Sequence, residues 1–153
     1  FTGGIEIVAR TEEAMRVLSQ KIRDREIEKR YLCIVHGLPE PREATLEGYL
    51  EKNEEQNRVY ILKKAKTGAR TIATHYRVLE ERDGLSLLEV ELLTGRKHQI
   101  RVHLASEHHP LVGDDLYGTP RPCGLMLHAH SVSFTHPVTG EYIHIEAPCP
   151  WEP

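Results

Sequence analysis

Basic and hydrogen-bonding side chains are concentrated in the segment TGRKHQIRVH, residues 94–103, which contains no acidic residue. Such side chains suit a phosphate group, a buried carboxylate or a metal ion as ligand. If the segment begins a helix, its unpaired N–H groups add an anion-binding site, and Gly95 lets a ligand approach the backbone. The residues that could carry this chemistry are Arg96, Lys97, His98, Gln99, Arg101 and His103.

Helical spacing would divide these side chains between two faces. Residues three or four positions apart share a face, so His98 and Arg101 are expected to lie together. Ile100 and Leu104 would then point into the core. Two interpretations stay open. In the first, Arg96, His98 and the backbone bind phosphate while Arg101 turns inward to a carboxylate; in the second, the helix has a solvated basic face.

Ten histidines raise the question of a metal-dependent hydrolase. The candidate ligands are His98, His103, His128 and His130, of which the last two would share one face of a strand. The sequence has no His-Glu-x-x-His motif, however, and no cysteine pair at ligand spacing. It also has no Gly-x-Ser-x-Gly motif for a serine nucleophile. We therefore expect no metal site and keep the hydrolase as the least favoured alternative.

Charge is distributed unevenly along the chain. The net charge of −3 argues against a compact nucleic-acid-binding protein, since such proteins are often basic. Residues 56–79, however, include no acid, whereas residues 40–55 are strongly acidic. Local fields guide ligands more than the net charge does, so the acid-free segment argues for nucleic-acid binding; ordinary surface variation is the alternative. Its basic residues are Arg58, Lys63, Lys64, Lys66, Arg70 and Arg77.

Size and composition favour one domain in the cytoplasm. A chain of 153 residues, 39% of them hydrophobic, can bury a core of its own. It has no recognisable signal peptide and no apolar run near the roughly 18 residues of a membrane span. Three scattered cysteines, Cys33, Cys123 and Cys149, form no Cys-x-x-Cys pair, which suits a reducing compartment.

Hydrophobic spacing and turn signals predict an α+β fold, with a mixed, mostly antiparallel sheet flanked by a few helices. Thr11 should cap the first helix, which extends to about Arg25. Asp83 and Gly84 are typical of a tight hairpin turn. The second helix is expected over residues 97–107. Strands are expected at residues 3–10, 28–37, 45–50, 58–62, 69–80, 85–92, 124–137 and 141–147.

Four segments together resemble the RluA-type RNA pseudouridine synthase family. The segment LLTGRKHQIRVHLASEHHPLVGDDLYG resembles the signature of that family almost position by position. TGGIEIVART is similar to the segment after the family's catalytic loop, RDREIEKRYLCIVHG to its Lys-x-Tyr segment, and LMLHAHSVSFTHPVTGE to its closing hairpin. The resemblance covers essentially the whole chain in the same order, so it is far more specific than a single motif.

This resemblance implies a fold, a reaction and a partner. The fold is the pseudouridine-synthase catalytic fold. The reaction converts a uridine within RNA into its C-glycoside isomer, without metal or cofactor, after the target base has been flipped out of its context. The implied partner is RNA, ribosomal RNA more commonly than transfer RNA. The implied enzyme is a cytoplasmic monomer without a membrane attachment.

Matching positions imply roles for particular residues. Tyr31 would stack its ring on the flipped uracil, although the strand pattern alone indicates only a half-buried ring. Arg101 would pair with the catalytic aspartate and lower its pKa, because a guanidinium is always charged and can bind both carboxylate oxygens. The residues expected to bind substrate are Lys29, Arg96, His98 and Gln99.

The family's catalytic aspartate has no match in this sequence. It lies in a His-Arg-Leu-Asp motif that would end shortly before Phe1. We therefore expect residues 1–153 to be the carboxy-terminal part of one catalytic domain, inactive alone, with Arg101 lacking its partner. Asp114 and Asp115 are expected in a solvated loop, and no internal aspartate is expected to replace the nucleophile. The main alternative is a non-catalytic RNA-binding module of the same fold.

Overall fold

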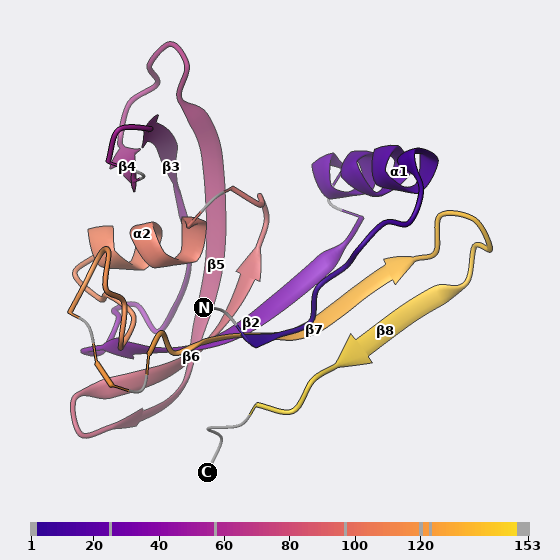
Figure 1. Cartoon of the computed structure of the whole chain (residues 1–153). Helices are drawn as coiled ribbons and strands as arrows, with labels where there is room; N and C mark the ends of the chain where they lie inside the picture. Colours follow the sequence, from indigo (N-terminus) through magenta and orange to yellow (C-terminus); the bar gives the residue numbers. More distant parts are fainter. Residues whose placement is uncertain are drawn as a thin grey trace.

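The computed structural model describes residues 3–24, 26–56, 58–96, 98–119, 121–122 and 124–149, and it confirms the predicted α+β class (Figure 1). The helices in this part of the chain are α1 (Glu12–Arg23) and α2 (Gln99–Ser106). The strands are β1 (Gly3–Gly4), β2 (Glu28–His36), β3 (Glu43–Asn53), β4 (Arg58–Leu62), β5 (Arg70–Arg82), β6 (Leu85–Leu92), β7 (Leu127–Thr135) and β8 (Tyr142–Glu146). Lys97, Arg25 and Cys123, which the sequence analysis named, lie outside the described residues.

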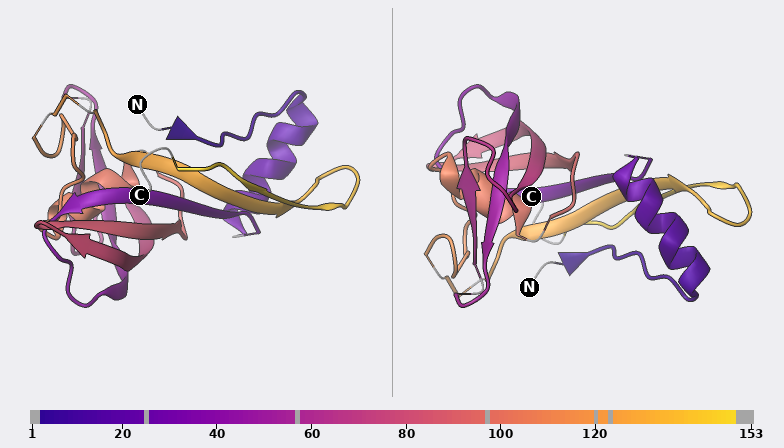
Figure 2. Two further views of the ribbon diagram at one scale, coloured as in Figure 1. Left: turned by 90° about the horizontal axis from the view of Figure 1, so that it is seen from below. Right: turned by 90° about the horizontal axis from the view of Figure 1, so that it is seen from above.

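These strands form one sheet in the order β1-β7-β2-β6-β5-β3-β4, with β8 paired to β7. The pairing of β1 with β7 is parallel, and the other pairings between the described strands are antiparallel. Figures 1 and 2 show the β7–β8 hairpin and α1 extending to one side, away from α2 and β3–β5. The predicted mixed, mostly antiparallel sheet is therefore confirmed.

The larger core lies between α2 and the central strands. Ile100 and Leu104 are 4% and 1% exposed and pack with Leu88 and Val90 of β6, as their helical spacing predicts. A neighbouring cluster joins Val102 of α2 to residues of β3, β4 and β5. Burial of such side chains stabilises each by about 1.5–3 kcal/mol relative to exposure. Two sides of α2 are thus anchored, which fixes the helix that carries Arg101.

Helix α1 begins as the sequence predicts. Thr11 has extended backbone angles, and its hydroxyl accepts a hydrogen bond from the N–H of Ala14 at 3.1 Å. Leu18 then packs against Ile27 and Val132, so α1 covers β7 with a small core of its own. Neither helix of the described ranges is long and apolar enough to cross a membrane.

Several predicted bounds differ from the structure, since β3 is longer than the predicted strand 45–50 and β7 is shorter than the predicted strand 124–137. Two other differences have a clear local cause. Residues 3–10 were expected to form a strand, but only Gly3 and Gly4 pair with β7, because the chain then leaves the sheet to cover the α1 core with Ile5 and Ile7. The second helix begins at Gln99, two residues later than predicted. His98 has a φ of 56°, in the left-handed region, and a right-handed helix cannot include it.

Candidate active site

One pocket of about 340 Å³ gathers most of the predicted site residues. It lies between β2, the end of β6, the start of α2 and the segment before β7. Residues far apart in sequence, such as Tyr31 and Arg101, meet there because β2 pairs with both β6 and β7. The lining residues are Tyr31, Leu92, Arg96, His98, Gln99, Ile100, Arg101, Leu125 and Leu127.

Tyr31 lies in regular register with β6, opposite Val90. On its other side the register with β7 shifts between Arg30 and Tyr31, where β7 carries the extra residue His130. The ring is half-buried, and this burial raises the pKa of the Tyr31 hydroxyl, which therefore stays protonated at neutral pH. The ring also borders a second pocket of about 260 Å³, so it separates two neighbouring cavities.

Lys29 lines this second pocket and does not reach the one around Arg101. Lys29 and Tyr31 are two positions apart on β2 and therefore lie on the same face of the sheet. Burial lowers the pKa of the Lys29 ammonium group. Glu6 lines the same pocket, but no ion pair joins the two side chains. The predicted substrate-binding residues thus occupy two adjoining pockets that share Tyr31.

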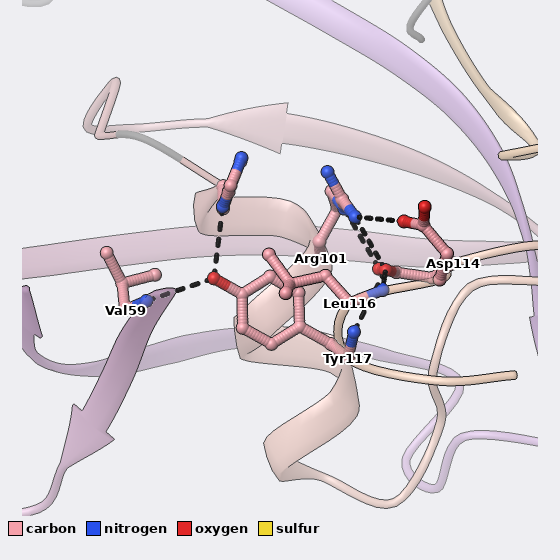
Figure 3. A network of polar contacts seen from close by, with 7 residues as sticks. Val59, Arg101, Asp114, Leu116 and Tyr117 are labelled. Carbon is pink, nitrogen blue, oxygen red and sulfur yellow. Dashed lines mark hydrogen bonds and ion pairs between the residues drawn. The ribbon is translucent and has the colours of Figure 1, made fainter. Parts of the chain in front are cut away.

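Arg101 is held by Asp114, which the sequence analysis did not expect. The Arg101 Nη2 and Nε atoms donate to the two carboxylate oxygens of Asp114 at 2.7 and 3.0 Å (Figure 3). Asp115 adds a longer contact of 3.5 Å. The hydrogen bond to Asp114 raises the pKa of Arg101. The expectation that Arg101 lacks a partner in this chain is therefore wrong.

Asp114 is fully buried, whereas the Asp115 side chain is 79% exposed. The Asp114 carboxylate also accepts the backbone N–H groups of Leu116 and Tyr117, both at 3.0 Å. Burial alone would raise the pKa of Asp114, but the bonds from Arg101 and the two backbone groups outweigh it and lower the pKa. The expected solvated loop is correct for Asp115 and wrong for Asp114, because Arg101 draws Asp114 inward.

Tyr117 connects the site to the edge of the sheet. Its hydroxyl accepts the backbone N–H of Val59 at 3.0 Å (Figure 3). It is also hydrogen-bonded to Nδ1 of His98 at 3.0 Å. The His98 and Tyr117 rings also meet edge to face, with centroids 5.6 Å apart. The ring of His98 is thereby fixed between α2 and β4. Sequence reasoning missed Tyr117, since no local pattern links it to His98 or Val59.

Gln99 positions the site and has no polar atom to spare for a substrate. Its side chain is 2% exposed. Its oxygen accepts from the Thr94 hydroxyl at 2.7 Å and the Arg96 N–H at 3.1 Å. Its nitrogen donates to Ala73 O and the Thr74 hydroxyl, both at 2.9 Å. These four bonds tie the turn before α2 to β5, while the Arg96 side chain is exposed at the pocket.

The histidines proposed as metal ligands are hydrogen-bonded to other protein groups. His103 is buried against the Thr74 hydroxyl at 2.9 Å, and burial lowers its pKa. His128 and His130 both contact the carbonyl oxygen of Ala147, at 3.1 and 3.0 Å. Across the described ranges, no group of three or more histidine, cysteine or acidic side chains has the geometry to hold a metal ion. The geometry gives no support to the hydrolase alternative.

Comparison with known proteins defines the class of the domain. The family described as RNA pseudouridylate synthase matches residues 1–106. An uncharacterized RNA pseudouridine synthase of Mycobacterium bovis is 38% identical over 156 residues, covering 97% of this chain and 50% of that protein. Ribosomal large subunit pseudouridine synthase D of Neisseria meningitidis is 36% identical over 163 residues, covering 97% of this chain and 43% of that protein.

A solved structure agrees with these relatives. Human RNA Pseudouridylate Synthase Domain Containing 1 matches with a TM-score of 0.79 and 28% identity, over 95% of this chain and 64% of that one. The architecture is therefore that of a pseudouridylate synthase domain. The chain belongs to the RNA pseudouridylate synthase family, as the four sequence segments predict. It spans about half the length of the curated relatives it matches.

Proposed function

We propose that the enzyme containing this chain isomerises specific uridines of RNA to pseudouridine. The observation that carries the proposal is the single pocket in which Tyr31, Arg96, His98 and Arg101 converge, within a chain of this family. An aromatic ring suits stacking on a flipped base, and cationic groups suit the phosphates around it. The other named lining residues are mostly apolar, as a base pocket requires.

The proposed reaction exchanges one bond to the ribose for another. The bond between uracil N1 and C1′ breaks, and a bond between C5 and C1′ forms. The hydrogen on C5 leaves as a proton while N1 gains one, so the reaction needs no oxidant, metal or cofactor. A catalytic aspartate acts as the nucleophile, and the detached uracil turns before it is rejoined.

Each pocket residue has a proposed part in this chemistry. The neutral Tyr31 ring stacks on the uracil. Arg101, held by Asp114, offers its remaining Nη1 group to the nucleophilic carboxylate and keeps that carboxylate ionised. Arg96 and His98 contact the RNA backbone at the start of α2. Lys29 supports the bound RNA from the adjoining pocket.

The nucleophile is proposed to lie outside these residues. The sequence contains no His-Arg-Leu-Asp motif, and the residues that line the Arg101 pocket include no carboxylate. Asp114 is a poor substitute, because it is buried and accepts four hydrogen bonds. A non-catalytic RNA-binding module is the second candidate function, favoured by the same missing carboxylate. An aspartate at the family position in a longer form of the protein would exclude it.

Ribosomal RNA in the cytoplasm is the proposed substrate, and the enzyme is proposed to act as a monomer. The choice of ribosomal RNA is supported by relatives named as ribosomal large subunit pseudouridine synthases, such as the one from Neisseria meningitidis. Transfer RNA is the second candidate. The specificity of such enzymes for one uridine depends on loops and appended domains beyond the pocket.

A tritium-release assay tests the proposal. The substrate is ribosomal RNA transcribed with uridine labelled at C5, because formation of the C5–C1′ bond expels that hydrogen. Residues 1–153 are compared with the longest natural form of the protein. Release by the long form alone is the expected result. Absence of release by the long form from ribosomal and transfer RNA would contradict the enzymatic proposal and leave the binding module.

A further inference from the structure

Arg58, at the start of β4, is a cation without an anionic partner. Its side chain is half-buried, and its Nε atom is buried without a hydrogen bond. Its guanidinium carbon lies 5.1 Å from the ring centre of Tyr117 and 6.0 Å from that of Tyr60. Within the described chain, no carboxylate forms an ion pair with Arg58. Its guanidinium group therefore packs against two aromatic rings but has no opposite charge beside it.

Two other cations of the acid-free segment are paired with carboxylates. Lys66 is paired with Glu51 at 2.9 Å, and Arg77 with Glu89 at 3.2 Å. Burying a charged group in part without an opposite charge is costly, and an anionic ligand would offset that cost at Arg58. Arg58 therefore differs from Arg77 of the same segment, which lies on β5 and is paired with Glu89.

Tyr117 places Arg58 beside the pocket. The ring that carries the Arg58 guanidinium also lies 5.5 Å from the guanidinium carbon of Arg101, and its hydroxyl is bonded to His98. The ring of Tyr117 thus packs against the guanidinium groups of both Arg58 on β4 and Arg101 on α2. Stacking on aromatic faces restricts a guanidinium, so less entropy is lost when it binds a ligand. Strand β4 is also the last strand in the sheet order, and no described strand covers its outer edge.

We infer that Arg58 binds a phosphate of the RNA strand next to the target uridine, and that it extends the binding surface from the pocket across the edge of β4. This inference rests on the proposed function, because it takes RNA as the ligand. A phosphate is the anion that fits, since guanidinium groups bind its oxygens through two parallel hydrogen bonds. The residue lies outside the pocket lining and takes no part in the chemical step.

The test measures RNA binding as a function of salt. A fluorescein-labelled single-stranded RNA is titrated with this chain and with the longest natural form, each as wild type and as the variants Arg58→Ala, Arg58→Lys and Arg77→Ala. We expect Arg58→Ala to reduce the slope of log K against log salt by about 0.7, the value for one phosphate contact to a single strand. Arg58→Lys should keep the wild-type slope, and so should the control Arg77→Ala, because Arg77 is paired with Glu89, which also pairs with Arg30.

Other outcomes overturn the inference. If Arg58→Ala lowers the melting temperature but leaves the slope unchanged, Arg58 serves only to cover the tyrosine rings. Equal effects of Arg58→Ala and Arg77→Ala would reflect net charge and not a site. The inference would also be refuted if RNA binding by the wild-type protein did not depend on salt. The tritium-release assay of the long form tests the proposed function separately from the Arg58 inference, because tritium release does not depend on the salt slopes of RNA binding.

Discussion

Arg101 on α2 and Asp114 in the loop that follows α2 form a two-point ion pair, with N–O distances of 2.7 and 3.0 Å. The pair fixes the plane of the guanidinium and uses its Nε and Nη2 groups. Nη1 takes part in no hydrogen bond within the described ranges. A second carboxylate can therefore approach Nη1 without displacing Asp114. In the proposed function, Asp114 is the residue that orients Arg101 toward the nucleophile.

Replacing Asp114 should destabilise the fold far more than replacing its neighbour. Asp114→Asn removes the charge that compensates Arg101, whose side chain is only 15% exposed. Breaking one side of a buried pair costs about 3 kcal/mol. Asp115→Asn is the matched control, because an exposed contact contributes at most about 1 kcal/mol. Urea unfolding of this chain measures both, and equal losses would show that the pair contributes little.

Acid should remove the contribution of Asp114. Its pKa in the folded protein is lower than the ordinary value of 3.8, so its ionised form stabilises the folded state at pH values above 3.8. That stability is lost as the pH falls from 3.8 through the lower folded-state pKa. The difference in unfolding free energy between wild type and Asp114→Asn should thus be largest near neutral pH and shrink on acidification. A difference that stays constant from neutral pH to pH values well below 3.8 would refute the ion pair as its cause.

Local patterns predicted most of the fold because local physics decides those elements. Asp83 and Gly84 have φ angles of 53° and 77°, the left-handed values that a tight hairpin turn requires, and they join β5 to β6 as expected. Thr11 caps α1 for the same kind of local reason. Residues 5–10 were misassigned, since alternating apolar residues fit both a strand and a segment that packs beside a helix.

The site was predicted less completely, because its key partners are distant in sequence. Helical spacing predicted that His98 and Arg101 lie together; both line the pocket, although His98 precedes α2. The family resemblance added Tyr31. Neither could show that Asp114 turns inward, since a Gly-Asp-Asp sequence is also typical of an exposed turn. The available signal was Arg101 itself: a cation on a helix with a buried face needs an acid, and Asp114 and Asp115 are the nearest aspartates after it.

Arg96 and Arg101 should separate binding from turnover. Arg96→Ala in the long form should reduce the salt slope of RNA binding by about 0.7, because its exposed side chain meets a phosphate. Arg101→Lys is preferable to Arg101→Ala, since it leaves a cation for Asp114. It should lower kcat about 10- to 150-fold, through loss of a charge-assisted hydrogen bond of roughly 1.5–3 kcal/mol, and leave RNA affinity unchanged. Equal loss of affinity in both variants would contradict this division.

Tyr31 should act through its ring and not through its hydroxyl. Tyr31→Phe in the long form should retain RNA affinity and most of the turnover, because the hydroxyl stays neutral and the stacking surface is kept. Tyr31→Ala should weaken binding of RNA that contains the target uridine by about 1–3 kcal/mol, or roughly 5- to 150-fold in Kd. Tyr142→Ala is the control, since this tyrosine of β8 is 67% exposed and lines neither pocket that borders Tyr31. If Tyr31→Phe is as impaired as Tyr31→Ala, the hydroxyl has a chemical role and the stacking assignment is wrong.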